Sequence, residues 1–169
     1  MSELSKLTLV NRRYLRIKVF QALYAYYRTE NADLQKFERG VFESITKLFT
    51  LYLYLVKLVM EVEVVANELI EQNRKKKLPT ADDLNPNLKF SKNRVFAKLR
   101  ENVMLGQILE RSKVNWDEEH DEIRKLFKLF KTEDVFNLYT AREDDNMETD
   151  KGIMVALFTE MLSATDILH

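Results

Sequence analysis

An apolar pattern with the period of an α-helix runs almost unbroken from about Leu34 to Lys76. Side chains that recur every three or four residues share one face of a helix, so the pattern predicts a long amphipathic helix, with Gly40 as its weakest point. The whole chain of 169 residues contains only three glycines and two prolines. Because hairpins and tight turns depend on these residues, we exclude an all-β fold and predict an all-α protein, a multi-helix bundle of about five to seven helices.

The remaining helices are predicted from local start and stop signals. The first ten residues have no periodicity and predict a flexible lead-in, and both prolines, Pro79 and Pro86, fall in a polar linker. Ser91 predicts the cap of one later helix, and Asp150 predicts the cap of the last one. Further helices are expected over residues 12–28, residues 91–111, residues 115–130, from residue 132 and from residue 150 onward. Residues 11–169 thus predict a single helical domain.

Composition excludes several classes of protein. Cysteine is absent, which excludes a disulfide scaffold, zinc–thiolate sites and thiol catalysis. The most apolar stretch, Leu48 to Val56, is bounded by lysines and is far shorter than the roughly 20 residues of a membrane helix. The N-terminal residues also lack the apolar run of a signal peptide. We therefore expect a cytoplasmic protein with no membrane contact.

The formal net charge is zero, but the charges are segregated along the chain. Residues 1–28 carry six basic and one acidic residue, a net charge of +5. Residues 74–100 carry nine basic and two acidic residues, a net charge of +7. Residues 117–150 carry five basic and twelve acidic residues, a net charge of −7. Partners are therefore indicated by the distribution of charge and not by its total.

Two acidic stretches resemble metal sites but lack the necessary geometry. His120 lies among the carboxylates of residues 117–122, yet neighbouring positions on a helix point in different directions and do not converge on one ion. A calcium loop that began at Asp144 would need glycine at its sixth position, where the sequence has Thr149. We therefore predict no metal and no other cofactor. The first stretch is interpreted as an acidic helix start favoured by the helix dipole, and the second as a polar connector.

Two other features bear on enzymatic and stacking chemistry. Tyr52 and Tyr54 could offer a stacking surface, but aromatic residues at helical spacing among leucines and valines predict core positions. The chain has two histidines, no cysteine and no carboxylate pair at a spacing that would place it across a cleft. We predict that the protein is not an enzyme.

The helix expected over residues 12–28 carries its arginines in an unusual place. On a helical wheel, three arginines fall in the same sector as three apolar residues: Arg12, Arg13 and Arg16 with Phe20, Leu23 and Tyr27. Positive charge at a helix start opposes the helix dipole by about 0.3–1 kcal/mol per residue, and a guanidinium binds phosphate bidentately. Tyr14 and Tyr24 add stacking surface. From the residues alone, nucleic-acid binding and solubility charge are both open interpretations.

The order of residues in this helix resembles the first helix of the transcription antitermination factor NusB family. In that family an arginine-rich start precedes a QALY-like signature. The matching residues are Arg12, Arg13, Arg16, Gln21, Ala22, Leu23 and Tyr24. The later stretches SITKLFTLYLYLVKL and KKLPTADDLNPNLKF look like the long-form members, which carry a helical extension after the first helix.

The resemblance implies a small, all-helical, non-enzymatic protein. Members of the family bind the single-stranded boxA element of nascent RNA together with NusE, a component of the small ribosomal subunit. The complex keeps RNA polymerase elongating through ribosomal RNA operons. The C-terminal half of the family, with a Phe-(Val/Ile)-Asn-Gly-like signature, is not among these residues, so we expect the domain to lack that half and much of its surface for NusE.

Carried onto this chain, the resemblance predicts an RNA site. The expected RNA-binding residues are Arg12, Arg13, Arg16 and Tyr24, with Lys75, Lys76 and Lys77 as a second and weaker contact. We expect Phe20 and Leu23 to be buried, with the first turns of the helix overhanging the edge of the bundle. The basic segment 74–100 is expected either to extend the RNA surface or to dock against the acidic segment 117–150.

The last helix carries an apolar stripe that predicts self-association. Its members are Ile153, Met154, Leu157, Phe158, Met161 and Leu162, with Ile167 and Leu168 following. If this stripe were exposed, association would cover it, so a homodimer through the C-terminal helix is expected. The alternative function is a helical protein–protein adaptor without specific RNA binding, whose basic strip meets an acidic partner or the acidic segment 117–150.

Overall fold

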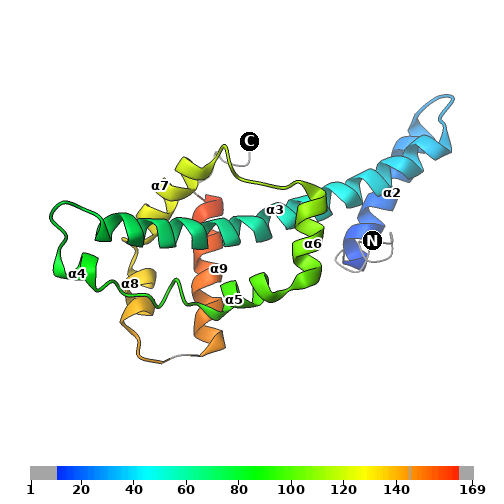
Figure 1. The fold of residues 1–169 in the computed structure, drawn as a ribbon. Helices are drawn as coiled ribbons and strands as arrows, with labels where there is room; N and C mark the ends of the chain where they lie inside the picture. The colour runs from blue at the N-terminus through cyan, green and yellow to red at the C-terminus, as the bar shows by residue number, and fades with distance from the viewer. Residues whose placement is uncertain (1–10, 145, 164–169) are drawn as a thin grey trace. The chain divides into compact units, whose positions relative to one another are not determined.

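The structure is a computed structural model that describes residues 11–144 and 146–163, with side chains described as far as residue 161. Within these residues the protein is entirely helical, which confirms the all-α prediction (Figure 1). The helices are α2 (Arg12–Arg28), α3 (Leu34–Arg74), α4 (Ala81–Leu84), α5 (Arg94–Glu101), α6 (Val103–Ser112), α7 (His120–Phe130), α8 (Asp134–Ala141) and α9 (Met147–Ser163). None of the described helices is long and apolar enough to cross a bilayer.

The chain divides into two compact units, Met1–Leu55 and Val56–His169. Their boundary falls within α3, which is one helix without a break at Gly40. Unit 1 contains α2 and the first part of α3, and unit 2 contains the rest of α3 and all later helices. The single domain expected over residues 11–169 stays a prediction, and the expected lead-in lies outside the described residues.

Unit 2 has one continuous apolar core. The end of α3 contributes a stripe with helical spacing, which includes Val62, Val65 and Leu69. The loop before α5 and the later helices add a cluster of rings that contact one another at centroid distances of 5.1–5.7 Å: Phe90 with Phe96, Phe127 and Phe136, and Phe130 with Phe136. Burial of these side chains is the main stabilising contribution in this unit, since each fully buried large apolar side chain contributes about 1.5–3 kcal/mol.

The apolar stripe of α9 belongs to this core. Ile153, Met154, Leu157 and Met161 are buried, and α9 packs against α5, α7 and α8. The premise of the expected homodimer, an uncovered stripe on the last helix, is therefore wrong for these four residues. Ile167 and Leu168 lie outside the described part of the chain.

Asparagine side chains set helix starts that the periodicity did not reveal. The expected helix over residues 91–111 is two helices, because the Asn102 side chain accepts a hydrogen bond from the backbone N–H of Leu105 at 3.0 Å and begins a new helix. Asn93, and not Ser91, caps α5. Asn146, and not Asp150, accepts from the backbone N–H of Thr149 at 2.8 Å at the start of α9. With the short α4, these changes give eight described helices against the five to seven expected.

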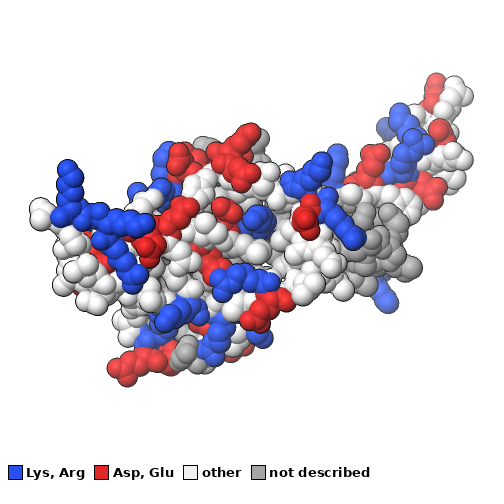
Figure 2. Space-filling view, viewed as in Figure 1, with Lys and Arg blue, Asp and Glu red and all other residues white. Residues whose placement is uncertain are grey.

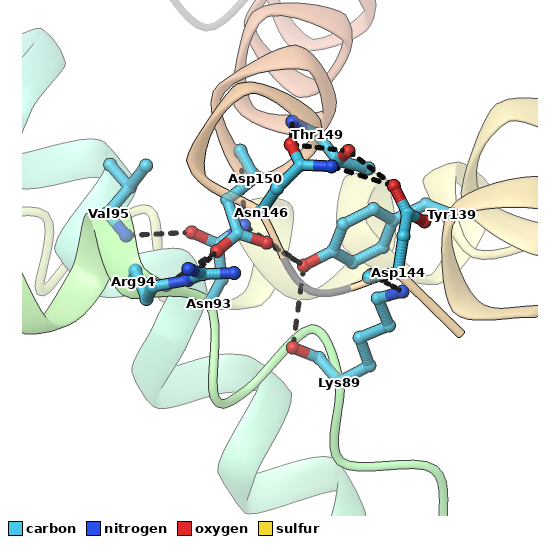
Figure 3. A network of polar contacts seen from close by, with 9 residues as sticks. All are labelled: Lys89, Asn93, Arg94, Val95, Tyr139, Asp144, Asn146, Thr149 and Asp150. Atoms are coloured by element: carbon cyan, nitrogen blue, oxygen red, sulfur yellow. Dashed lines mark hydrogen bonds and ion pairs between the residues drawn. The ribbon is translucent and has the colours of Figure 1, made fainter. Parts of the chain in front are cut away.

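Asp150 instead joins three helices through its buried carboxylate (Figure 3). It accepts hydrogen bonds from the Tyr139 hydroxyl at 2.8 Å, from the backbone N–H of Arg94 at 3.2 Å and from Arg94 Nε at 2.9 Å. The Asn93 side-chain amide donates to the Asp150 carbonyl oxygen at 3.0 Å and contacts the Tyr139 hydroxyl at 3.2 Å. A residue of α9 therefore stabilises the N-terminus of α5 and holds α8 against both helices.

The basic segment 74–100 docks on the acidic segment 117–150 at several points, one of the two outcomes expected for it. Lys89 Nζ donates to the Asp144 carbonyl oxygen at 2.8 Å and to the Arg142 carbonyl oxygen at 2.5 Å. Asp144 itself accepts from Arg142, Asn146 and Thr149, and its pKa is lowered, first by the hydrogen bond from Arg142. Asp144 and Asn146, both in the polar connector before α9, are therefore joined by hydrogen bonds to neighbouring residues (Figure 3).

A buried carboxylate on α3 pairs with α5. Glu63 is 5% exposed and accepts a hydrogen bond from the guanidinium of Arg100. Burial raises the pKa of Glu63, and the charge of Arg100 acts in the opposite direction. Because an ionised carboxylate is costly to bury without a partner, this pair makes the contact between α3 and α5 specific.

His120 forms the corresponding polar link between α3 and the start of α7. Its Nδ1 lies 3.4 Å from Glu61 Oε1 and its Nε2 lies 3.1 Å from Glu68 Oε2. Lys57 Nζ pairs with Glu61 Oε2 at 3.7 Å. The pKa of His120 is raised, chiefly by the hydrogen bond with Glu68 and with a further contribution from Glu61. The described residues contain no group of three or more His, Cys, Asp or Glu that could hold a metal ion.

We expect these contacts to make the stability of unit 2 depend on pH near neutrality. Because the folded protein raises the pKa of His120 above the value of about 6.5 expected in the unfolded chain, the stabilisation is complete below that value. It is lost as the pH rises through the folded pKa. Urea unfolding between pH 6 and pH 8 should show the fall, and His120→Gln should abolish it. The matched change His169→Gln, at the other histidine of the chain, should leave the fall in stability unchanged. If His169→Gln abolishes the fall and His120→Gln does not, the assignment to His120 is wrong.

Candidate nucleic-acid interface

The arginines expected to bind RNA lie on the first turns of α2. Asn11 caps this helix, with its side-chain oxygen accepting from the backbone N–H of Arg13 at 2.6 Å. No acidic residue occupies the first turn of α2. Arg12, Arg13 and Arg16 are all exposed, and none of them forms a hydrogen bond or an ion pair among the described residues. No described residue therefore occupies their guanidinium groups.

The apolar residues in the same sector are exposed as well, so one part of the expected packing is wrong. Phe20 is 70% exposed, Leu23 43% and Tyr27 81%, and α2 contains no buried residue. The half-buried residues lie on the opposite side of the helix: Tyr14, Leu15, Lys18, Ala22, Ala25 and Tyr26. The arginines do not share a sector with the core. They share a sector with exposed apolar and aromatic side chains, and together they form one mixed face.

We call this the arginine–aromatic face of α2 and define it by Arg12, Arg13, Arg16, Phe20, Leu23, Tyr24, Tyr27 and Arg28. Tyr24 is 58% exposed, as expected for a residue that can stack on a base. The guanidinium of Arg28 lies over the Tyr24 ring, 5.8 Å from its centroid, within the range of a cation–π interaction. Phe20 and Tyr27 were missed as members of the site because an apolar residue on a helix is ordinarily assigned to the core. Arg28 was missed because only the arginines at the start of the helix were considered.

A second feature of unit 1 lies on the other side of α2, facing α3. The edge of the Tyr26 ring packs against Phe37 with centroids 5.8 Å apart, which joins the two helices. Beside this contact is an open groove of about 410 Å³. Its lining is apolar apart from one carboxylate: Val19, Ala22, Leu23, Tyr26, Leu34, Phe37, Val41 and Phe42, with Glu38. Such a groove can accept apolar side chains of a partner.

The aromatic residues expected in the core of α3 divide between two environments. Phe49 is buried, whereas Tyr52 and Tyr54 are 44% and 37% exposed. The Phe49 and Tyr52 rings are stacked with centroids 6.4 Å apart. The core assignment of the two tyrosines is therefore wrong, because both side chains are exposed within the described residues.

The three lysines of the second expected contact are not equivalent. Lys76 Nζ pairs with Asp83 Oδ1 at 3.1 Å, whereas Lys75 and Lys77 are exposed and without such a partner in the described part of the chain. Figure 2 shows basic side chains gathered where α3 ends near α4, and acidic side chains gathered where α7 begins. Two of the three lysines thus remain available to an anionic ligand in unit 2.

Comparison of the chain with protein families, with curated proteins and with solved structures finds no match. The site is therefore interpreted from its own residues, their exposure and their charge.

Proposed function

We propose that the protein binds single-stranded RNA through the arginine–aromatic face of α2, as a transcription antitermination factor of the NusB type. The observation that carries the proposal is the exposure, on one side of one helix, of three guanidinium groups at the start and of Phe20, Tyr24 and Tyr27 behind them. Single-stranded nucleic acids are bound by this combination, because cations follow the phosphates and aromatic rings stack on the unpaired bases.

The NusB-type part of the proposal rests on the order of residues in α2. From this resemblance we propose a boxA-like single strand as the RNA. We propose NusE, in an elongating RNA polymerase complex, as the protein partner. Preference for a boxA-like oligonucleotide over a scrambled one of the same composition is the measurement that separates this function from general attraction of RNA to positive charge. Equal affinity for the two would leave a non-specific RNA binder and refute the NusB-type assignment.

Replacing Arg12, Arg13 and Arg16 together with alanine should remove most of the salt dependence of RNA binding. Three contacts to the phosphates of a single strand predict a slope of log affinity against log salt of about −2, from about −0.7 per contact. Fluorescence anisotropy of a labelled RNA at several salt concentrations measures the slope. The helix content should change little, because the three side chains are exposed.

The matched control is the triple change of Lys36, Arg39 and Lys47 to alanine. These residues are exposed on α3 in the same unit, so the control removes the same charge from a different surface. It should retain the salt slope. If both triple variants lose the same affinity and slope, attraction to the overall charge of unit 1 explains the binding and the α2 site is wrong.

Tyr24→Ala should weaken RNA binding, and Tyr24→Phe should not. Stacking needs the ring and contributes about 1–3 kcal/mol per base, whereas the hydroxyl is dispensable for it. Because Tyr24 is more than half exposed, the melting temperature should move little in either variant. A loss of affinity that is accompanied by an equal loss of stability would instead assign Tyr24 a structural role, and Tyr52→Ala serves as the control for an exposed tyrosine outside this face.

The second candidate function is a helical protein–protein adaptor, favoured by the apolar groove between α2 and α3. Its lining differs from the arginine–aromatic face except at Leu23, so the two candidates can be separated by mutation. Val41→Glu in the groove should abolish binding of an apolar partner helix and leave RNA affinity unchanged. The arginine triple variant should have the opposite effect.

A further inference from the structure

A pocket of about 250 Å³ lies in unit 2 between the end of α3, the segment around α4, and helices α7 and α8. Its apolar side is formed by three core rings: Phe90, Phe127 and Phe136. Its volume is below the roughly 300–1,000 Å³ of pockets for drug-sized ligands, so it suits a single small group. None of the residues of α2 lines it, and no function considered above uses it.

The walls of the pocket are fixed by bonds that do not involve a ligand. Asp83 accepts from the backbone N–H of Thr80 at 3.0 Å and from Lys76 at 3.1 Å, and its pKa is lowered first by the bond from Thr80. Asn87 donates to the Thr140 carbonyl oxygen at 2.9 Å. The segment around α4 is thereby held against α3 and α8, which keeps the pocket formed without a ligand.

Four other side chains of the lining have unused hydrogen-bonding groups. They are the carboxylate of Asp82, the ammonium of Lys131, the amide of Asn73 and the hydroxyl of Ser91. In the described part of the chain, none of these side chains forms a hydrogen bond or an ion pair. In particular, Asp82 and Lys131 line the same pocket but do not pair with each other. The pocket thus offers one anionic acceptor, one cationic donor, an amide and a hydroxyl around an apolar side.

We propose that this pocket binds a guanine base. Guanine presents two adjacent donors, N1–H and the 2-amino group, which suit the two oxygens of a carboxylate. On another edge it presents two adjacent acceptors, O6 and N7, which are the atoms that lysine contacts in guanine recognition. Adenine and cytosine lack the paired donors, and uracil lacks both the paired donors and the paired acceptors. In this assignment Asp82 accepts from the first edge and Lys131 donates to the second, and the ring system lies against the apolar side of the pocket.

The first test uses free nucleotides and the chain of 169 residues. Titration calorimetry should show that GMP binds more tightly than AMP, CMP or UMP by roughly 5- to 150-fold, the discrimination expected for one good bidentate contact. IMP, which lacks the 2-amino group, should bind between GMP and AMP. Equal affinity for all four nucleotides, or no binding of GMP at millimolar concentration, would overturn the proposal.

Two variants and one control locate the site. Asp82→Asn keeps the shape but converts one acceptor into a donor, and it should bring the affinity for GMP to that for AMP. Lys131→Met should weaken GMP binding at least tenfold. Lys128→Met removes an equivalent charge from an exposed position on α7, three residues before Lys131 and outside the pocket lining, and should have no effect. If Lys128→Met weakens GMP binding as much as Lys131→Met does, the contact is a general charge effect and the assigned site is wrong.

A final experiment tests whether the pocket binds a free nucleotide or a base within an RNA strand. A short single-stranded RNA with one guanine is compared with the same RNA carrying inosine at that position, in the wild-type chain and in the Asp82→Asn variant. If the wild-type chain binds the guanine RNA more tightly than the inosine RNA and the Asp82→Asn variant does not, the pocket binds a base of the strand. If the wild-type chain prefers GMP among the nucleotides but binds the two RNAs equally, the pocket is a site for a free nucleotide. The guanine preference is measured again in a chain with Arg12, Arg13 and Arg16 replaced by alanine. This repeat separates the contribution of the pocket from that of the α2 arginines.

Discussion

Asp150→Ala is expected to lower the free energy of unfolding by about 3 kcal/mol. The carboxylate is 2% exposed and accepts from Tyr139, from the Arg94 backbone and from the Arg94 side chain. Its loss leaves the buried Tyr139 hydroxyl with weaker contacts. The effect falls at the lower end of the range for a broken buried pair because the Arg94 side chain is 41% exposed and can be hydrated. Thermal unfolding should show a decrease of roughly 6–12 °C.

A matched control and a double-mutant cycle identify the cause of this effect. Glu143→Ala removes an exposed carboxylate from the nearby connector and should change the free energy of unfolding by no more than about 0.5 kcal/mol. Tyr139→Phe should cost about 1 kcal/mol, and it should cost less when Asp150 is already asparagine. Equal stability of Asp150→Ala and Glu143→Ala would show that the network contributes nothing.

Arg100→Met should destabilise the protein by about 2–3 kcal/mol at neutral pH, because it leaves the buried carboxylate of Glu63 without its cation. The expected loss is moderate since the Arg100 side chain is 57% exposed and is not itself costly to hydrate. Burial already raises the pKa of Glu63, and removal of Arg100 raises it further. The measurement is denaturant unfolding at a series of pH values.

The pH dependence of Arg100→Met has a definite sign. A carboxyl whose folded pKa lies above its unfolded value is favoured in its protonated form by folding, so the destabilisation is largest above the folded pKa and diminishes as the pH falls through it. The double variant Glu63→Met/Arg100→Met should recover most of the loss at neutral pH, because no buried charge remains. Arg111→Met, at an exposed arginine on α6, is the control. If the double variant is no more stable than Arg100→Met alone, the unpaired carboxylate of Glu63 is not the cause of the destabilisation.

Much of the secondary structure could be predicted because local signals determine it. The helix expected over residues 12–28 is α2 to the residue, and the long helix expected to end near Lys76 ends at Arg74. The break at Asn102 could not be predicted from periodicity, since an apolar spacing continues across it while a side-chain cap restarts the helix. The role of Asp150 was missed for a different reason: its partners lie on helices remote in sequence.

Four residues of the candidate site could be predicted from the sequence, but the exposure of the apolar residues beside them could not. A helical wheel shows which side chains share a face, but α2 has apolar side chains on both sides, and a wheel alone does not tell which side is covered. The exposed positions of Phe20 and Leu23 depend on how α2 meets α3 through Tyr26 and Phe37. The same limitation led to the core assignment of Tyr52 and Tyr54. The pocket of unit 2 combines residues that lie between positions 66 and 140, which no local pattern groups together.

The absence of buried residues from α2 also bears on its folding. An isolated helix of this length is marginally stable in water, and helices in proteins owe most of their stability to the packing of one apolar face. The backbone hydrogen bonds of α2 should therefore open by local fluctuations at a much lower free energy than those of the unit 2 core. A ligand that covers the outer face of such a helix adds packing contacts that the folded protein does not provide. Part of the free energy of binding then offsets the conformational entropy lost when the helix becomes ordered. Affinity at this face is then coupled to helix formation, and substitutions that raise the helix propensity of α2 without touching the ligand strengthen binding.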